Sequence, residues 1–286
     1  MGVKRLPRKL FSELDPWAYA VAVKRKRLQR HLRDAFRGKR FAADKAEPLP
    51  VLIYEHKSLI RRRLGNVDMT LQENKAVNLS LAAPSVDGIL IRPGETFSFW
   101  RLVGQCTARK GYREGLTITR QGPSRGIGGG MCQFTNLLHW MTLHSPLTIC
   151  EHHHHDTVDL FPDFNRQVPF GVGTSIFYNY LDYRVYNPTK TSYQFRVWVT
   201  GEHLCGELRA ETRPPVKYHI VEEDRQFTEE NGAWYRRNAV YRSAIDVRTG
   251  NETERTLLKR CNARVMYELE DTFVKDAALG VPESKP

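Results

Sequence analysis

The sequence lacks the long apolar segments of membrane-spanning and secreted proteins. No stretch approaches about 20 consecutive apolar residues, the length that a transmembrane helix needs. Residues 1–17 include several basic side chains, but no apolar segment follows them, which is not the pattern of a secretory signal peptide. We therefore expect a cytoplasmic protein, or one attached peripherally to the inner face of the membrane.

Paired cysteines and a nucleotide-binding motif are also missing. The cysteine count is odd and no two cysteines have CxxC spacing, which argues against a disulfide framework and against a zinc ribbon. The glycine-rich stretch at residues 126–130 lacks the lysine and Ser/Thr of a phosphate-binding loop, so we do not expect a nucleotide site. The sequence predicts no cofactor. The five cysteines are Cys106, Cys132, Cys150, Cys205 and Cys261.

Positive charge is concentrated at one end of the chain. The formal net charge is +12, and residues 1–63 alone hold 18 Lys and Arg against 6 Asp and Glu. Such a segment suits an anionic partner, namely a membrane leaflet, nucleic acid or an acidic protein surface. We expect an anionic membrane surface to bind residues 1–45, and we do not expect nucleic acid.

The basic segment also carries a helix pattern. Asp15 is a candidate N-cap for a helix over residues 17–36, in which Leu28, Leu32 and Phe36 recur at every fourth position. Two interpretations stay open: the helix lies on an anionic membrane, or it packs on the protein with a solvated basic face. On the first interpretation residues 1–45 can be deleted without unfolding the rest.

The remaining pattern predicts an α+β fold. Helices are expected over residues 69–81 and 132–143, and extended segments around 88–100 and 147–150. Aromatic and β-branched segments on either side of the turn at 187–190 predict a β-hairpin, and further antiparallel strands follow. The predicted units are a basic helical arm (1–47), a core domain (48–212), a β-rich carboxyl-terminal extension (213–274) and a disordered tail (275–286).

A glycine-cysteine-helix motif is the first candidate for chemistry. In the expected helix four apolar residues share one face, and four polar residues share the other: Cys132, Thr135, Asn136 and His139. A cysteine at a helix start is favoured as a thiolate by the unpaired N–H groups, so Cys132 is expected to have a lowered pKa and to be the most reactive thiol. The alternative is a tight loop with a buried structural cysteine.

Backbone and side-chain donors beside Cys132 suggest an oxyanion hole. The amides of Gly128, Gly129 and Gly130, with the N–H of Cys132, are candidate donors to a developing oxyanion. The side chain of Gln133 is a further candidate donor. The glycines would also clear space for a substrate in front of the sulfur.

A run of four histidines after the helix supplies a candidate base. On a strand His153 and His155 share one face, while His152 and His154 share the other. A helix with a thiol, followed by a strand with imidazoles, is the order that a papain-like thiol enzyme needs. Two alternatives stay open, a zinc site made with Cys132 and a polar strand end without chemistry. Our expectation is that no metal is required.

Three segments resemble the VanW family, which is named after an accessory gene of vancomycin-resistance clusters. They are PGETFSFWRLVGQCTARKGYREG, GIGGGMCQFTNLLHW and CEHHHHDTV, and later segments such as FPDFNRQVPFG resemble the subgroup that contains the namesake. The resemblance implies a glycine triplet, a Cys-Gln pair and a Glu-x-His-x-His string as the family motif. In this sequence those positions are Gly128, Gly129, Gly130, Cys132, Gln133, Glu151, His153 and His155.

One element that many members of this family carry is missing. Where they have Gly-x-Asp-Ala, this chain reads FGVGTSIFY without an aspartate. Asp156, Asp159 and Asp182 are the candidates to replace it. The glycine-cysteine segment also resembles the nucleophile segment of transglutaminase-like thiol enzymes, and a papain- or transglutaminase-like core is therefore expected.

The function that the resemblance implies concerns glycopeptide resistance and the cell wall. We expect a thiol-dependent hydrolase or acyl transferase that acts on an amide of a cell-wall precursor, with Cys132 as nucleophile and His153 or His155 as base. Glu151 would support the histidines. The sequence leaves open whether the chain is an enzyme, because a non-catalytic accessory protein that binds a ligand or a partner would suit the same motifs.

Overall fold

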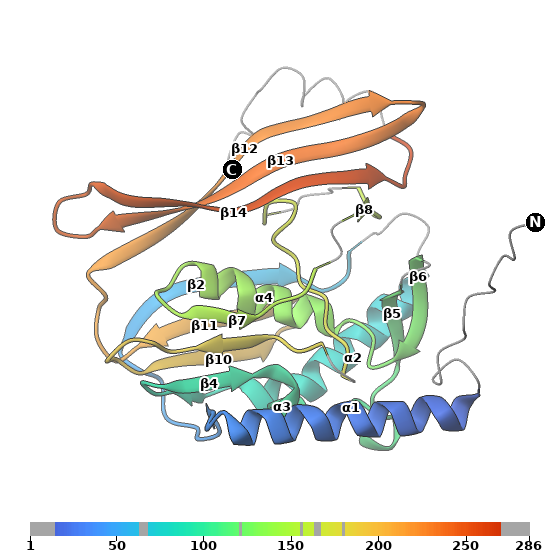
Figure 1. Ribbon diagram of the computed structural model, residues 1–286, viewed down its shortest axis with the longest axis horizontal. Coiled ribbons are helices and arrows are strands. Elements are labelled where there is room, and N and C mark those ends of the chain that lie inside the picture. Colours follow the sequence, from blue (N-terminus) through green and yellow to red (C-terminus); the bar gives the residue numbers. More distant parts are fainter. Residues whose placement is uncertain are drawn as a thin grey trace, which may run out of the picture.

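Antiparallel strands dominate the structure, and helices cover one side of them, as an α+β fold requires. The computed structural model describes residues 15–62, 68–119, 122–154, 157–162, 167–178 and 181–269. The α+β class is confirmed, with sheets that are mostly antiparallel. Figure 1 shows a lower body that contains the helices, and a long three-stranded ribbon above it.

The lower body contains two four-stranded sheets. The first has the order β2 (Val51–Leu59), β11 (His203–Ala210), β10 (Tyr193–Val199) and β3 (Ile89–Ile91). The second has the order β1 (Arg40–Phe41), β4 (Glu95–Ser98), β9 (Arg184–Tyr186) and β7 (Thr148–Glu151). The strand predicted at 147–150 is thus confirmed as β7.

Two helices pack on the first sheet through one shared hydrophobic core. They are α2 (Met69–Val86) and α4 (Met131–Leu143), and α4 comes so close to β11 that a Cβ at Gly206 would lie 2.8 Å from Cε of Met141. Both helices are confirmed. α2 runs further than predicted, past Pro84, because its last turn buries apolar side chains in the core.

The upper sheet is a meander joined by two tight turns. Its order is β12 (Val216–Glu230), β13 (Ala233–Asp246), β14 (Glu252–Val265) and the short β8 (Val158–Asp159). The first turn has positive φ angles at both Asn231 and Gly232, which is the geometry that an Asn-Gly pair favours. The antiparallel strands expected after residue 213 are therefore confirmed.

The hairpin predicted across residues 187–190 is wrong. β9, before this turn, pairs with β4 and β7, whereas β10, after it, pairs with β11 and β3. The side chain of Asn187 donates to the carbonyls of Ile91 and Thr191, both at 2.8 Å, and so holds the chain where it crosses between the sheets. A turn motif predicts that the chain reverses, but it does not predict which strands pair.

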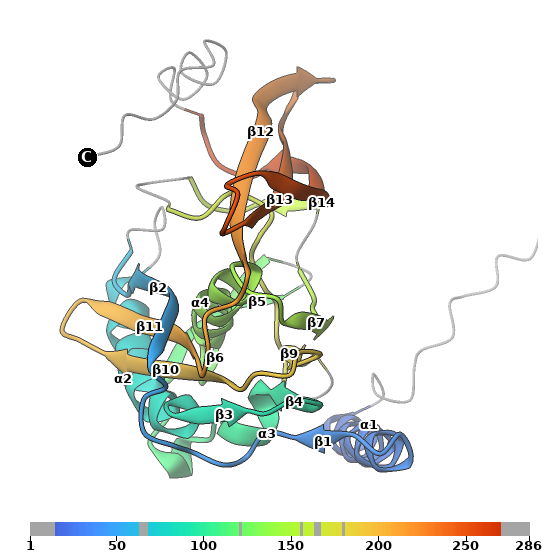
Figure 2. The ribbon, with the colours of Figure 1, turned by 90° about the vertical axis from the view of Figure 1, so that its left-hand side faces the viewer.

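The amino-terminal helix α1 (Pro16–Phe36) lies along one edge of the lower body. Asp15 is its N-cap, as predicted, and accepts a hydrogen bond from the N–H of Ala18 at 2.9 Å. Figure 1 shows α1 along the bottom of the molecule, and Figure 2 shows it end-on beside β1. The helix therefore packs on the protein, one of the two interpretations that the sequence left open. The remaining short helices are α3 (Phe99–Val103) and the 3-10 turn Ala108–Lys110.

Membrane-spanning helices are not found in the described part of the chain. None of its helices combines the length and the apolar character that crossing a bilayer requires. The tail predicted to be disordered, 275–286, lies outside the described residues.

Candidate functional site

The three glycines before α4 are required because the backbone approaches three different neighbours. They follow a hairpin of β5 (Glu114–Thr119) and β6 (Gly122–Ile127). A Cβ on any of them would collide with a neighbour: with Cys106 at Gly128, with Gly115 at Gly129 and with Lys75 at Gly130. Gly128 and Gly130 also have positive φ angles, of 78° and 100°. The glycine triplet thus serves close packing at the start of α4.

The backbone donors of this loop are already used. The N–H groups of Gly128, Gly129 and Gly130 donate to backbone carbonyls at 2.9 to 3.1 Å. The amide of Gln133 donates to Oγ of Ser58 at 2.9 Å and to the carbonyl of Leu59 at 2.8 Å, which ties α4 to β2. In this conformation none of these four groups points into an oxyanion hole.

Cys132 lies in the first turn of α4, as predicted, but its electrostatic environment is not the expected one. Burial raises the pKa of this thiol, and it outweighs the opposing hydrogen bonds from the backbone N–H groups of Ile176 and of Cys132 itself. The expected lowering is therefore wrong, because desolvation exceeds the effect of the helix start. Cys132 is partly buried, whereas Cys150 is the exposed thiol.

The polar face of α4 is covered by residues 172–176, which we call the cover segment. The N–H of Thr174 donates to Oδ1 of Asn136 at 2.6 Å, and its hydroxyl donates to the same oxygen at 2.9 Å. Thr135 adds a short hydroxyl contact with Thr174. In Figure 1 the chain that includes this segment, drawn in yellow, descends from the upper sheet past α4. The cover segment thus lies over the polar face of α4, and the N–H of its Ile176 reaches the thiol of Cys132.

Two of the four histidines lie along the same polar face. The ring of His152 stacks on His139 of α4, with centroids 4.3 Å apart and an interplanar angle of 6°. His154 lies against the cover segment, where a Cβ on Gly173 would be 2.9 Å from its Nε2 and 3.8 Å from Oδ1 of Asn136. Burial, together with His152 and His154, keeps the pKa of His139 well below its usual value, so its ring is neutral.

His153 faces away from α4 and contacts Glu151. Its Nε2 lies 3.2 Å from Oε1 of the carboxylate. β7 ends at Glu151, so the histidines follow the strand instead of lying on it, and His152 stacks on the thiol helix whereas His153 contacts Glu151. His155, the second base candidate, lies outside the described residues.

Glu151, at the end of β7, joins the histidine motif to the amino-terminal helix. Arg30 of α1 donates to both of its carboxylate oxygens at 2.8 Å, and the N–H of Asp182 donates to it at 2.9 Å. Burial would raise the pKa of Glu151, but these donors, with His153, lower it. Arg184 and Asp34 form a second, fully buried ion pair between β9 and α1 at 2.9 Å.

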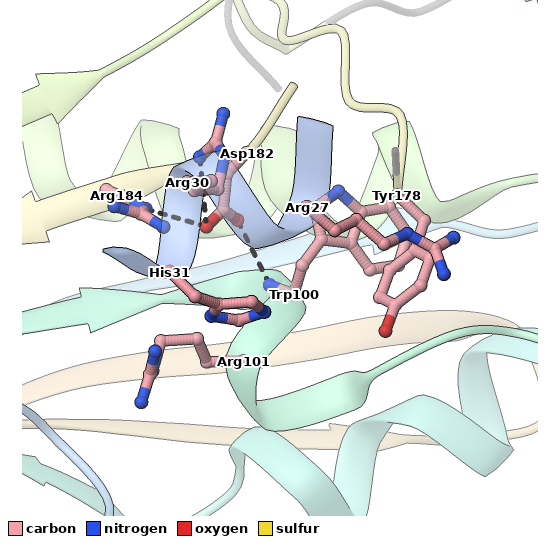
Figure 3. A pocket seen from close by; sticks show the side chains of 8 residues that line it. All are labelled: Arg27, Arg30, His31, Trp100, Arg101, Tyr178, Asp182 and Arg184. Carbon is pink, nitrogen blue, oxygen red and sulfur yellow. Dashed lines mark hydrogen bonds and ion pairs between the residues drawn. The ribbon is translucent and has the colours of Figure 1, made fainter. Parts of the chain in front are cut away.

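A small pocket lies where α1 meets the lower body. Its volume is about 60 Å³, and Figure 3 shows arginines and aromatic rings around it, with Asp182 at its centre. The guanidinium of Arg27 lies 4.2 Å from the centroid of the Tyr178 ring, and Asp182 accepts from Arg184 and from the N–H of Trp100. Carboxylates already pair with the inner arginines, so this pocket joins α1 to the body, and its volume is enough for several water molecules.

The candidate replacements for the missing family aspartate lie in other environments. Asp182 is buried in the network beneath α1 and accepts a hydrogen bond from Ser98 at 2.5 Å. Asp159 belongs to the upper sheet, where Tyr267 donates to it at 2.9 Å. Asp156 lies outside the described residues. Within the described residues no three His, Cys, Asp or Glu side chains are arranged to hold a metal ion.

Sequence reasoning missed several residues of this site. Asn136 and His139 were found on the polar face, at four and seven positions from Cys132, but the spacing gave them no role. A prediction of the places of His152 and His154 required knowledge of which side of the histidine run meets α4. Arg30 gave no local signal, because 121 residues separate it from Glu151.

Comparisons with known proteins identify relatives. Residues 74–209 match the family model described as VanW like protein. The vancomycin B-type resistance protein VanW of Enterococcus faecalis is 37% identical over 224 residues, which cover 78% of this chain and 81% of that protein. The uncharacterized protein YoaR of Bacillus subtilis is 39% identical over 66 residues, 23% of this chain and 22% of that protein. No solved structure matches.

Proposed function

Because the chain belongs to the family of VanW-like proteins, we propose that it is an accessory protein of glycopeptide resistance that acts on an amide of a cell-wall precursor. The relative from Enterococcus faecalis, which is named for vancomycin resistance, supports the resistance role. The chemistry is assigned to Cys132, in a thiol-dependent hydrolase or acyl transferase. A peripheral position at the inner face of the membrane belongs to the same proposal.

The observation that supports thiol chemistry is the polar face of α4. Cys132, Asn136 and His139 follow one another at four- and three-residue spacing, and the histidine run lies along them. His154, like Asn136 of α4, lies beside Gly173 of the cover segment. We assign the general base to this histidine run, with His154 added to the candidates His153 and His155.

The raised pKa of Cys132 decides how the reaction begins. At neutral pH the sulfur is protonated, so attack requires an imidazole to accept the S–H proton as the S–C bond forms at the amide carbonyl. The imidazolium then gives this proton to the leaving amine as the C–N bond breaks. Water, or an acceptor amine, then attacks the carbonyl of the thioester and loses a proton to the imidazole. The C–S bond breaks, and the imidazolium returns the proton to the sulfur to restore the thiol.

Donors to the oxyanion come from the start of α4. The N–H groups of Met131 and Cys132 are the first two of the helix and have no acceptor within it. They replace the glycine amides, which donate elsewhere. The order of thiol helix and histidine strand is that of papain- and transglutaminase-like enzymes, and we include such a core in the proposal by this analogy.

A non-catalytic binding role is the second candidate, and the cover segment favours it. The hydrogen bonds of Thr174 to Asn136 close the polar face of α4, and burial raises the pKa of Cys132, which disfavours its thiolate. A protein that only binds a precursor would need neither an open thiol nor a base.

One experiment separates the two candidates. The purified protein is incubated with a pool of cell-wall precursors, and intact-protein mass spectrometry follows adducts while chromatography follows products. We expect a thioester on Cys132, product release that Cys132→Ala abolishes, and a rate that His154→Gln lowers by roughly 10²–10⁴. Cys205→Ala, a change in the first sheet, is the matched control and leaves the rate unchanged.

The opposite result is equally definite. Retained precursor binding without a thioester or a product, in the unaltered protein and in Cys132→Ala alike, would replace the enzyme by the binding protein.

A further inference from the structure

The buried face of α2 carries two polar side chains without partners. Gln72 and Lys75 are three residues apart on this helix, with exposed fractions of 1% and 6%. Neither polar atom of the Gln72 amide has a hydrogen-bond partner, and no hydrogen bond or ion pair reaches Lys75 within the part of the chain that the structure describes. Asn78, two turns along from Gln72, is different, because it bonds to Gly129 and Arg113.

Lys75 lies at the start of α4. Its aliphatic stem fills the position that a Cβ on Gly130 would occupy, and Gly130 is the N-cap of α4. The amine therefore lies beside the first turn of a 13-residue helix, where the N–H groups of Met131 and Cys132 have no acceptor within the helix.

The surroundings of Lys75 are positive. Burial lowers the pKa of its amine to about 7, and the charges of Arg62 and Arg61 contribute to this lowering. Arg61 is paired with Glu73 at 2.6 Å, and the start of a helix adds a partial positive charge.

Unpartnered polar groups of this kind point to an external partner. A buried amide without hydrogen bonds destabilises the fold, and the burial of most of the Lys75 side chain beside other cations disfavours the charged form of its amine. An anionic oxygen group would satisfy the amine and the amide N–H₂ together, and the positive end of the α4 dipole favours an anion nearby. Neutral or cationic ligands would leave the amine unsatisfied.

We propose that Gln72 and Lys75, beside the first turn of α4, bind a carboxylate or phosphate group of the ligand. The proposal rests on the proposed function in one respect: it places the anionic group of the precursor next to the amide that Cys132 attacks. The anion site itself does not depend on thiol chemistry, and its test is separate.

Lysine labelling tests the site with simple anions. The full chain is acetylated with limiting acetic anhydride at neutral pH, with acetate or inorganic phosphate as the probe, and each lysine is quantified by mass mapping. We expect saturable protection of Lys75 by at least one anion, and no protection of the exposed Lys57 on β2. The anion that protects Lys75 at the lower concentration identifies the ligand group as carboxylate or phosphate.

Variants separate this site from the catalytic proposal. Gln72→Leu should lower the affinity for the protecting anion roughly tenfold, which corresponds to the loss of one hydrogen bond of about 1.4 kcal/mol. Cys132→Ala should leave the protection unchanged. Absence of protection by either anion, or an unaltered effect in Gln72→Leu, would overturn the anion site, whereas a missing thioester alone would overturn only the thiol chemistry.

A second inference concerns the outer face of α1. Five apolar side chains share this face, with exposed fractions from 38% to 87%: Trp17, Val21, Leu28, Leu32 and Phe36. Lys24 and Arg25, both exposed, lie among them. Arg30 and Asp34 face the protein instead and are fixed there by Glu151 and Arg184.

The geometry points to an anionic lipid surface as the partner of this face, which we call the outer stripe. Apolar side chains flanked by cations, on a helix that is held at one edge of the molecule, suit the boundary between headgroups and acyl chains. Each basic residue near such a surface adds to the attraction. The buried ion pairs leave α1 attached to the protein while its outer stripe contacts lipid.

Vesicle cosedimentation tests the outer stripe. The full chain should bind vesicles made of equal parts phosphatidylcholine and phosphatidylglycerol, and added salt should weaken the binding. Vesicles of phosphatidylcholine alone should bind far less. The triple variant Leu28→Ser, Leu32→Ser, Phe36→Ser should lose roughly tenfold or more in affinity. Leu257→Ser, at an exposed position on β14, should leave the affinity for these vesicles unchanged.

The same measurement can reject the proposal. Equal binding to both kinds of vesicle, full binding by the triple variant, or a dimer in lipid-free solution that the triple variant abolishes would overturn it.

Discussion

Burial sets the charge of the reactive side chains around α4. It raises the pKa of Cys132, lowers that of His139 and lowers that of Lys75 to about 7. At neutral pH the thiol and this imidazole are therefore both neutral, and Lys75 is near half-protonation. Proton transfer from this thiol to a neutral imidazole would create a thiolate-imidazolium pair, which burial disfavours, so the transfer is expected to accompany formation of the S–C bond.

Thiol labelling should follow burial. With iodoacetamide at neutral pH we expect Cys150, the exposed thiol, to react before the partly buried Cys132. Burial raises the pKa of both thiols, so their accessibility decides the order. Mass mapping over a time course measures the order. Faster labelling of Cys132 would mean that the cover segment opens readily and that the thiolate is stabilised after opening.

Lys75 should make the stability of the protein depend on pH. The pKa of its amine is about 7 in the folded state, against 10.5 for an exposed lysine, so the unfolded chain binds more protons between these two values. The free energy of unfolding should therefore rise with pH across this window. Lys75→Met should flatten this rise and stabilise the protein at neutral pH by roughly a few kcal/mol.

Urea unfolding at several pH values measures this effect. Arg61 and Arg62, the charged groups that contribute to the lowered pKa of Lys75, are present in both proteins. Lys57→Met is the matched control, because Lys57 is exposed. An equal slope in Lys75→Met and in the unaltered protein would show that another group titrates in this range.

Among the elements, α1 is attached by charge rather than by apolar packing. Two carboxylates pair with arginines where it meets the body, Asp34 with Arg184 and Glu151 with Arg30. Burial would raise the pKa of Asp34, but Arg184 lowers it, and the pKa of Glu151 is lowered in the same way. Their contribution to stability is present above about pH 4 and is lost as pH falls below it.

Removing one arginine should loosen α1. Arg30→Met leaves the buried carboxylate of Glu151 without its main partner, a change that typically costs about 3–5 kcal/mol when such a pair is buried and less here, because the pair is partly exposed. We expect tryptic cleavage within α1 to accelerate at neutral pH. Arg25→Met, on the exposed face of the same helix, is the control and should be cleaved at the original rate.

Local sequence patterns predict the elements but not their partners. Asp15 and the four-residue apolar spacing locate α1, since capping and periodicity are local properties. The pairing of Arg30 with Glu151 joins residues 121 positions apart, and no local signal encodes it. For the same reason the sequence could not show that His152 stacks on α4, because only the tertiary structure brings the two together.

The candidate site was predictable to the same extent. Cys132 at a helix start followed from its glycines, whereas its raised pKa follows from burial under residues brought from 172–176. Lys75 gave no signal in the sequence, because a lysine in an amphipathic helix is normally solvated. Its place in the proposed anion site follows from the contact of its aliphatic stem with Gly130.

For the whole molecule, the upper sheet fixes one end of the cover segment. Asn238 of β13 donates to the carbonyl of Phe170 at 2.9 Å, and Gly171 packs directly on the thiol of Cys261 in β14. The other end binds α4 through Thr174. The upper sheet therefore holds in place the segment that covers Cys132.

Disturbing this contact should expose the thiol. Gly171→Ala places a methyl group against Cys261 at a position with a φ of 96°, so the cover segment must shift. We expect faster alkylation of Cys132, by roughly tenfold if the closed state loses about 1.4 kcal/mol. Gly250→Ala, which also has a positive φ but no neighbour within 4 Å, is the control. Equal rates in both variants would show that the cover segment opens without the upper sheet.

The attachment of α1 has a consequence for the chain during its synthesis. Asp34 leaves the ribosome 150 residues before Arg184 does, roughly 8–30 s earlier at about 5–20 residues per second. For most of that interval neither Glu151 nor Arg184 is present to hold the helix, while its basic and apolar side chains are already complete. A nascent chain could therefore reach a lipid surface or a chaperone through α1 first, and the later arrival of β7 and β9 would then fold the protein at the place where α1 has settled.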